Sequence, residues 1–280
     1  MNVTEIFKDS LIYPTKDLNK LVILGSLITI VAILAILTVF SFITMSFSLP
    51  TVLGIITLIS ALIVGFIYNG YSLSIINETI ENKQMVENIN SFPDFNWSNN
   101  IVDGIKVWVL DIIYMIIPVI VTAIFAYVLL SFMPAPIGDL NITQLSTSLL
   151  SNPNSLEYSA QLNTLMIGVQ GLFTILSLVF TLFAKIAKVR LAETSRLSSI
   201  FEFEEIYNSI AKIGWGDYIV WFILLIVISS IIGVIMGIIF IIPIIGPIVF
   251  FLLFVPFMLI FESRATGLIY NESKIEHYAN

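Results

Sequence analysis

The sequence contains no cysteine and one histidine, His277, in its polar C-terminal segment. Without cysteine the chain has no disulfide, no thiol nucleophile and no zinc cluster of the Cys type. A lone histidine also excludes histidine-based metal clusters and catalytic triads confined to this chain. A phosphate loop of the form G-x-x-x-x-G-K is missing as well, which argues against an ATP-driven motor. We therefore expect no metal and no cofactor.

Charged residues are scarce too, at 11% of the chain, whereas a soluble domain carries about 25%. Hydrophobic residues make up 58% of the 280 residues, so the solvent for most of the chain must be lipid. The twelve lysines and arginines, with a net charge of −7, argue against nucleic-acid binding, which needs a concentrated basic surface.

Long apolar runs separated by short polar or proline-containing segments predict an all-α, polytopic integral membrane protein with about six transmembrane helices. One transmembrane domain, residues 1–280, accounts for the whole chain. The predicted spans are residues 21–44, 51–76, 112–133, 163–184, 218–242 and 247–261, and residues 262–280 form a polar tail.

With six spans, all twelve lysines and arginines fall on one side of the membrane. The positive-inside rule makes that side cytoplasmic, so we expect both termini in the cytoplasm and the protein in the plasma membrane. Segments that mix aromatic, acidic and apolar residues precede the odd-numbered spans, at residues 6–18, 92–110 and 200–217.

The segment before the fifth span has the clearest helical pattern. Its residues Ile200, Phe203, Ile206 and Ile210 recur every three or four positions, which predicts an amphipathic helix at the cytoplasmic interface, with this stripe facing the acyl chains or the bundle. We interpret the three segments as repeats of an interfacial helix plus a hairpin of spans. Short soluble connector helices are the alternative interpretation.

Two stretches carry a resemblance to a known family. One is Ser91–Trp97 (SFPDFNW), continuing through Val102–Lys106 (VDGIK) to Pro118; the other is Arg190–Arg196 (RLAETSR), followed by Ile213–Tyr218 (IGWGDY). Together they resemble the prokaryotic membrane-protein family known as domain of unknown function 4013, over nearly the whole chain. Ser195 stands where that family often has glycine. The resemblance implies a polytopic membrane protein and supplies no activity.

Four charged residues near the end of the fourth span form the first candidate site: Arg190, Glu193, Arg196 and Glu202. Arg190 and Glu193 lie three positions apart, as do Glu193 and Arg196, so on a helix they would share a face. The group is either a docking or headgroup site or an anchor at the helix end with mutually satisfied charges.

Asp111 and Asp217 stand immediately before the third and fifth spans, where we expect them to mark the membrane boundary. Gly233 and Gly237 form a small-xxx-small motif in the fifth span, which lets two helix backbones approach closely. Their partner is either another helix of this chain, the reading we favour, or a second copy.

No lysine, arginine, aspartate, glutamate or histidine lies within the predicted spans. Ion-coupled carriers usually need such groups on their pathway, so the absence disfavours that class. We expect a non-enzymatic membrane scaffold or partner-binding protein. Its expected partners are membrane lipids and other membrane proteins or further copies of itself. The alternative is a transporter or channel for a small, weakly charged or apolar solute.

Overall fold

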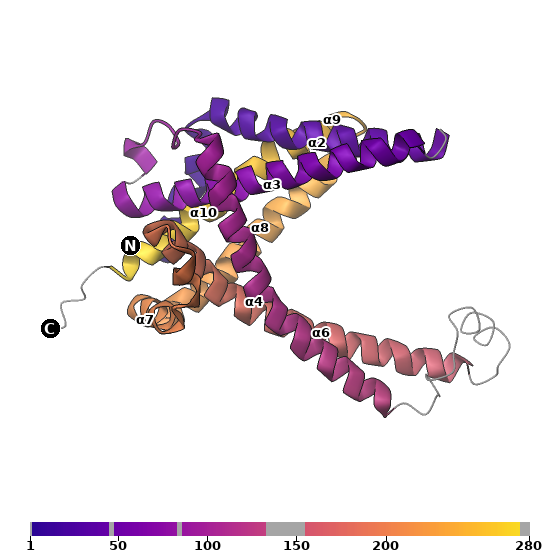
Figure 1. Cartoon of the computed structure of the whole chain (residues 1–280). Coiled ribbons are helices and arrows are strands. Elements are labelled where there is room, and N and C mark those ends of the chain that lie inside the picture. Colours follow the sequence, from indigo (N-terminus) through magenta and orange to yellow (C-terminus); the bar gives the residue numbers. More distant parts are fainter. Residues whose placement is uncertain (1, 45–47, 83–85, 133–154, 275–280) are drawn as a thin grey trace. The chain divides into compact units, whose positions relative to one another are not determined.

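A computed structural model of the chain describes residues 2–44, 48–82, 86–132 and 155–274, without the side chains of residues 155–161. Every regular element within these ranges is helical. Six helices are long and apolar enough to cross a membrane, which confirms the predicted class and number (Figure 1). They are α2 (Leu18–Thr44), α3 (Ser48–Asn82), α4 (Trp97–Ser131), α6 (Ser155–Thr194), α8 (Trp215–Phe240) and the continuous stretch Ile245–Glu272.

The last of these helices is not regular throughout. It begins as α9 (Ile245–Val249), passes through a π-helical turn, η5 (Phe250–Phe254), and continues as α10 (Val255–Glu272), in which Pro256 occupies the first turn. Proline lacks a backbone N–H and cannot make the usual bond to the carbonyl four residues earlier, so a wider turn before it is a common local solution.

The chain forms two compact units. One comprises residues 1–110 and 185–280, and the other comprises residues 111–184. The first unit contains the charged ends of the spanning helices, and the candidate site lies within it.

The hydrophobic core of the first unit gathers at the charged ends of its helices rather than along their apolar lengths. It contains Tyr13, Leu24, Tyr71 and Ile260, all buried, from four different elements. The segment after α3 contributes to this core as well. Its residues Val86, Ile89 and Phe92 are buried there, because their apolar side chains cover the ends of α2 and α3.

Glycines allow two pairs of helices to approach closely within the unit. A Cβ atom added to Gly70 of α3 would lie 1.8 Å from the carbonyl oxygen of Asn100 in α4, and one added to Gly104 of α4 would lie 1.8 Å from that of Phe66 in α3. A Cβ atom added to Gly25 of α2 would likewise clash with the backbone of the π-helical turn η5. Only residues without a side chain permit such contact, so these glycines fix where the helices cross.

Short helices precede two of the three odd-numbered spans. The chain begins with α1 (Val3–Ile12), closed at its start by a capping box between Asn2 and Glu5, and with the 3₁₀ turn η1 (Tyr13–Thr15). The 3₁₀ turn η4 (Leu197–Phe201) and α7 (Phe203–Ile213) come before α8. Before the third span the 3₁₀ turn η2 (Val86–Asn88) is followed by α4, which already starts at Trp97, so the described residues of the predicted segment 92–110 form no separate interfacial helix.

The residues of the predicted amphipathic stripe do not all lie on one helix. Ile206, Ile210 and Ile213 are buried in the unit, and Ile200 is buried in the preceding turn. Phe203 is 53% exposed, so it lies outside this packed stripe. The reason is that Phe203 is the first residue of α7 and Ile200 precedes the helix, so a single helical periodicity does not join them.

The residues predicted to form a polar tail from position 262 onward continue α10 as far as Glu272. Residues 263–270 of this helical part are buried, including Arg264, Ala265, Thr266 and Gly267. They pack against α1 and α3, and Gly267 makes this possible because a Cβ there would lie 2.7 Å from the Thr79 side chain.

Candidate functional site at the charged ends of the helices

A buried ion pair between Asp9 of α1 and Arg264 of α10 lies at the centre of the charged end of the first unit. Each side chain is 1% exposed. Arg264 Nε donates to Asp9 Oδ1 at 2.8 Å, and its Nη2 donates to Oδ2 at 3.4 Å. The backbone N–H of Val86 donates to Oδ2 at 2.7 Å, so the carboxylate accepts bonds from two other parts of the chain.

Further contacts surround the guanidinium of Arg264. Its Nη1 donates to the Thr79 hydroxyl at 3.4 Å, and its carbon Cζ lies 4.8 Å from the ring centre of Tyr13. The Tyr13 hydroxyl donates to Glu78 Oε2 at 2.9 Å. Burial raises the pKa of Tyr13 above its usual range, and the neighbouring Glu78 carboxylate raises it further, so this hydroxyl keeps its proton and remains a donor. The network joins α1, η1, α3 and α10 into one body.

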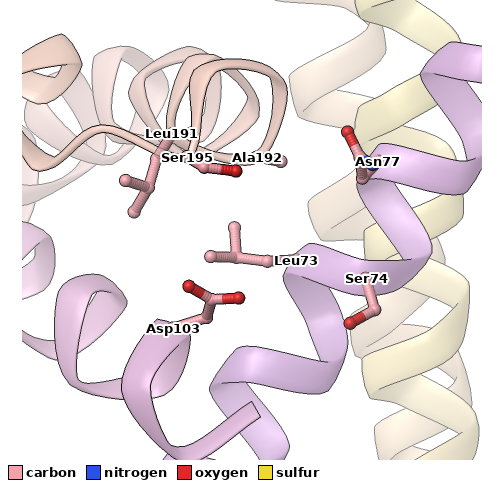
Figure 2. Close-up of a pocket in the computed structure, with 7 residues that line it drawn as sticks. All are labelled: Leu73, Ser74, Asn77, Asp103, Leu191, Ala192 and Ser195. Atoms are coloured by element: carbon pink, nitrogen blue, oxygen red, sulfur yellow. The ribbon is translucent and has the colours of Figure 1, made fainter. Parts of the chain in front are cut away.

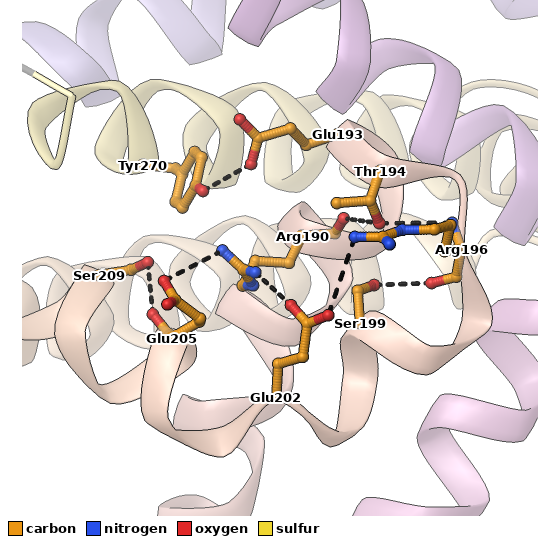
Figure 3. Close-up of polar contacts among 9 residues, drawn as sticks. All are labelled: Arg190, Glu193, Thr194, Arg196, Ser199, Glu202, Glu205, Ser209 and Tyr270. Atoms are coloured by element: carbon orange, nitrogen blue, oxygen red, sulfur yellow. Dashed lines mark hydrogen bonds and ion pairs between the residues drawn. The ribbon is translucent and has the colours of Figure 1, made fainter.

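Of the predicted cluster, Arg190 and Glu202 form a direct ion pair (Figure 3). Arg190 Nη1 also lies 3.9 Å from Glu205 Oε2, and Arg196 Nη2 lies 3.9 Å from Glu202 Oε1. Arg190 is 14% exposed and Arg196 is 67% exposed. Arg190 therefore fastens the end of α6 to α7, whereas Arg196 reaches into solvent.

Glu193, the fourth predicted residue, binds elsewhere. Its Oε2 accepts a hydrogen bond of 2.7 Å from the Tyr270 hydroxyl, and its Oε1 lies 2.8 Å from Lys274 Nζ (Figure 3 shows the tyrosine contact). Arg196 follows the end of α6 at Thr194, so the predicted three-residue pairing between Glu193 and Arg196 on one helix does not form. The four residues thus divide into an α6–α7 contact and an α6–α10 contact.

The remaining predicted residues lie apart from these networks. Asp217 is exposed in the first turn of α8, and Asp111 is exposed on α4 in the second unit. Within the described part of their unit, no atom other than the helix's own lies within 4 Å of a Cβ built on Gly233 or Gly237. We favoured another helix of this chain as their partner, and within the described part of this unit no helix packs against the two glycines.

Sequence reasoning missed Asp9 and the burial of Arg264. A signal for Arg264 exists, because Ile260, Phe261, Ala265 and Leu268 surround it with apolar side chains at helical spacing. No comparable signal marks Asp9, since the two partners are separated by 255 positions. Only the folded chain reveals that the first and last helices meet.

The described residues contain no group of three or more histidine, aspartate or glutamate side chains placed to hold a metal ion. Ion pairs join several of the helix ends, and one of them, Lys185–Glu262 at 3.0 Å, links α6 to α10. These ion pairs are suited to hold the helix ends together, and the charged side chains around them are suited to contact a membrane surface.

Six helices of spanning length and apolar composition, of which α2, α3 and α10 share a buried core, define a multi-pass α-helical membrane protein. The chain belongs to the family described as protein of unknown function, DUF4013, whose model matches residues 52–241. The resemblance carried by the motifs around Trp97 and Arg190 is thereby confirmed. No curated protein and no solved structure matches the chain.

Proposed function

We propose that this protein is a non-enzymatic scaffold of the plasma membrane, with both termini in the cytoplasm, that binds lipids and the helices of partner proteins through its lateral apolar faces. The proposal rests on a contrast in burial along the helices: their charged ends pack into a buried core, whereas their apolar lengths are mostly exposed. In α2, α3, α8 and the stretch Ile245–Glu272, between 11% and 22% of the most apolar window is buried within the chain.

The charged ends supply the rigidity that a scaffold needs. Buried contacts among α1, α3, α7 and α10 hold the helix ends together. A transporter, in contrast, must enclose a path between its spans, and it does so by packing those spans against one another around a central site.

Helix α8 offers the best-defined partner surface. Val234 and Ile238 are each 65% exposed, and Ile235 is 53% exposed. Val234 and Ile238 lie beside Gly233 and Gly237 on this helix, and the small size of the glycines lets a foreign helix backbone approach closely. A second copy of the chain and another membrane protein both have the required apolar helices.

The test places a photoreactive amino acid at Val234 in the full-length protein in native membranes. A matched control carries it at Leu225 on the same helix, which is 4% exposed. We expect protein adducts of defined mass from position 234 and none from position 225, since only the first faces outward. Lipid adducts alone from position 234, together with solute flux through liposomes containing the purified protein, would overturn the scaffold and favour a transporter or channel.

A further inference from the structure

A pocket of about 110 Å³ opens at the charged end of the first unit, between α3, the start of α4 and the end of α6. Its polar lining consists of Ser74, Asn77, Asp103 and Ser195, with Leu73 and Leu191 among the apolar residues (Figure 2). Figure 2 shows the carboxylate of Asp103 directed toward the space between these helices. The pocket shares no residue with the ion pairs of Asp9 or Arg190.

The polar groups of this pocket are mainly acceptors. Asp103 uses Oδ1 to bind Lys106, which leaves Oδ2 for a ligand. The amide nitrogen of Asn77 donates to Glu81 Oε1 at 2.9 Å, so its carbonyl oxygen is the atom left to accept. The end of α6 adds the partial negative charge of its last carbonyl groups, which have no partner inside the helix.

An ammonium group already bonds with two of these acceptors. Lys106 Nζ donates to Asp103 Oδ1 at 2.7 Å and to the backbone carbonyl of Ser195 at 3.2 Å. Ser195 presents this carbonyl because its backbone has turned into the left-handed region, with φ of 54°, directly after α6 ends. The geometry beside the pocket is thus compatible with an N–H donor carrying positive charge.

We propose that this pocket binds a primary ammonium group, carried either by an ethanolamine lipid headgroup or by a free small amine. The three N–H donors of a primary ammonium group match three acceptors of the pocket, namely the Asp103 carboxylate, the Asn77 carbonyl and the carbonyl groups at the end of α6. The volume accepts an aminoethyl group and excludes a whole lipid. Asp103 precedes the third predicted span and Ser195 follows the fourth, so both lie outside the hydrocarbon on the same, charged side of the membrane.

A choline headgroup serves as the discriminating probe because its nitrogen carries three methyl groups and no N–H donor. The experiment measures the melting temperature of the full-length protein in detergent as phosphatidylethanolamine or phosphatidylcholine with identical acyl chains is added. We expect a saturable rise with the ethanolamine lipid that clearly exceeds the rise with the choline lipid. Equal responses to both lipids would overturn the proposal.

Asp103→Asn should weaken the ethanolamine-specific response about tenfold to a hundredfold, since a charge-assisted hydrogen bond is lost. Asp94→Asn is the matched control, because Asp94 also pairs with a lysine, Lys20, but lies outside the pocket, and it should retain the response.

Asp103→Asn also removes the partner of Lys106, so a second variant guards against misfolding. Asn77→Leu keeps that ion pair and fills the pocket with an apolar side chain, and it should lose the response as well. Retention of the response by both variants would refute the site. Free ethanolamine separates the two sources: a rise with ethanolamine alone assigns the site to small amines, and a rise only with the lipid assigns it to the headgroup. The proposal does not depend on the scaffold function.

Discussion

Replacing Asp9 by asparagine should strongly destabilise the protein. The substitution leaves the Arg264 guanidinium buried at 1% exposure without the Asp9 carboxylate, and breaking a buried pair in this way costs about 3–5 kcal/mol. Asparagine has one carbonyl oxygen in place of two carboxylate oxygens, so if it keeps the bond from the Val86 backbone N–H, the variant loses the bond from Arg264 Nε together with the charge. Asp94→Asn breaks a pair whose carboxylate is fully exposed and should leave stability almost unchanged.

The measurement is reversible unfolding of the purified protein in mixed micelles with increasing denaturing detergent. The chain has four tryptophans, of which Trp221 is fully buried, so tryptophan fluorescence follows the loss of packing. Comparing the free energy of unfolding of the two single variants with that of the parent gives the size of each effect.

A double variant, Asp9→Asn with Arg264→Met, completes the experiment. Methionine fills much of the volume of the arginine and carries no charge, so the double variant should recover most of the loss seen with Asp9→Asn. The reasoning fails if Asp9→Asn is as stable as the parent protein. It also fails if the double variant is less stable than Asp9→Asn alone, because the cost would then not come from an unpaired charge.

Three further outcomes are expected. Gly70→Ala should destabilise the protein by about 1–3 kcal/mol or more in the same unfolding assay, because the new Cβ meets the α4 backbone. Gly65→Ala on the same helix is the control and should be neutral or stabilising, because its Cβ meets nothing within 4 Å. Equal effects of the two variants would contradict the helix crossing. Ile206→Asp should lower the melting temperature far more than Glu204→Ala, since Ile206 is fully buried and Glu204 is exposed. Size-exclusion profiles after heating measure the loss of folded protein, and a larger loss for Glu204→Ala would show that the acidic face is the packed one. A cysteine at Ser91, the only one in the chain, should resist a membrane-impermeant reagent in intact cells and react after permeabilisation, and reaction in intact cells would reverse the proposed orientation.

The membrane-spanning elements could be predicted from the sequence because each is a long apolar run, and lipid solvation demands such runs whatever the tertiary fold. The family resemblance could be recognised for a similar reason, since its motifs lie in the short polar stretches between those runs. Helix ends were less predictable. The helices α3, α4 and α6 continue past their apolar runs into charged sequence, where periodicity no longer distinguishes helix from loop.

The packed core at the charged ends was largely hidden from sequence reasoning. Its residues come from positions as distant as Tyr13 and Ile260, and hydropathy describes each local segment rather than their meeting. Phe92 illustrates the difficulty, because its neighbours Asn90 and Ser91 suggest a solvated loop while the ring itself is 2% exposed.

The candidate site was predictable in its residues but not in its pairing. Arg190 and Glu202 are brought together as ion partners because a turn follows α6 and returns α7 alongside it. Glu193 binds Tyr270 and Lys274. Both lie far from it along the chain, in the segment that its polar sequence led us to predict as a tail. Spacing along one helix cannot reveal partners that another helix supplies.

The separation of Asp9 from Arg264 by 255 positions has a consequence for biosynthesis. At about 5–20 residues per second, roughly 10–50 seconds pass between the emergence of the first helix and that of its partner. During this interval α1 has no docking site on α10, and the carboxylate of Asp9 must remain hydrated at the membrane surface. Docking of α1 through this ion pair can therefore occur only after Arg264 has been synthesised, so the amino-terminal helix reaches its final packing late in synthesis.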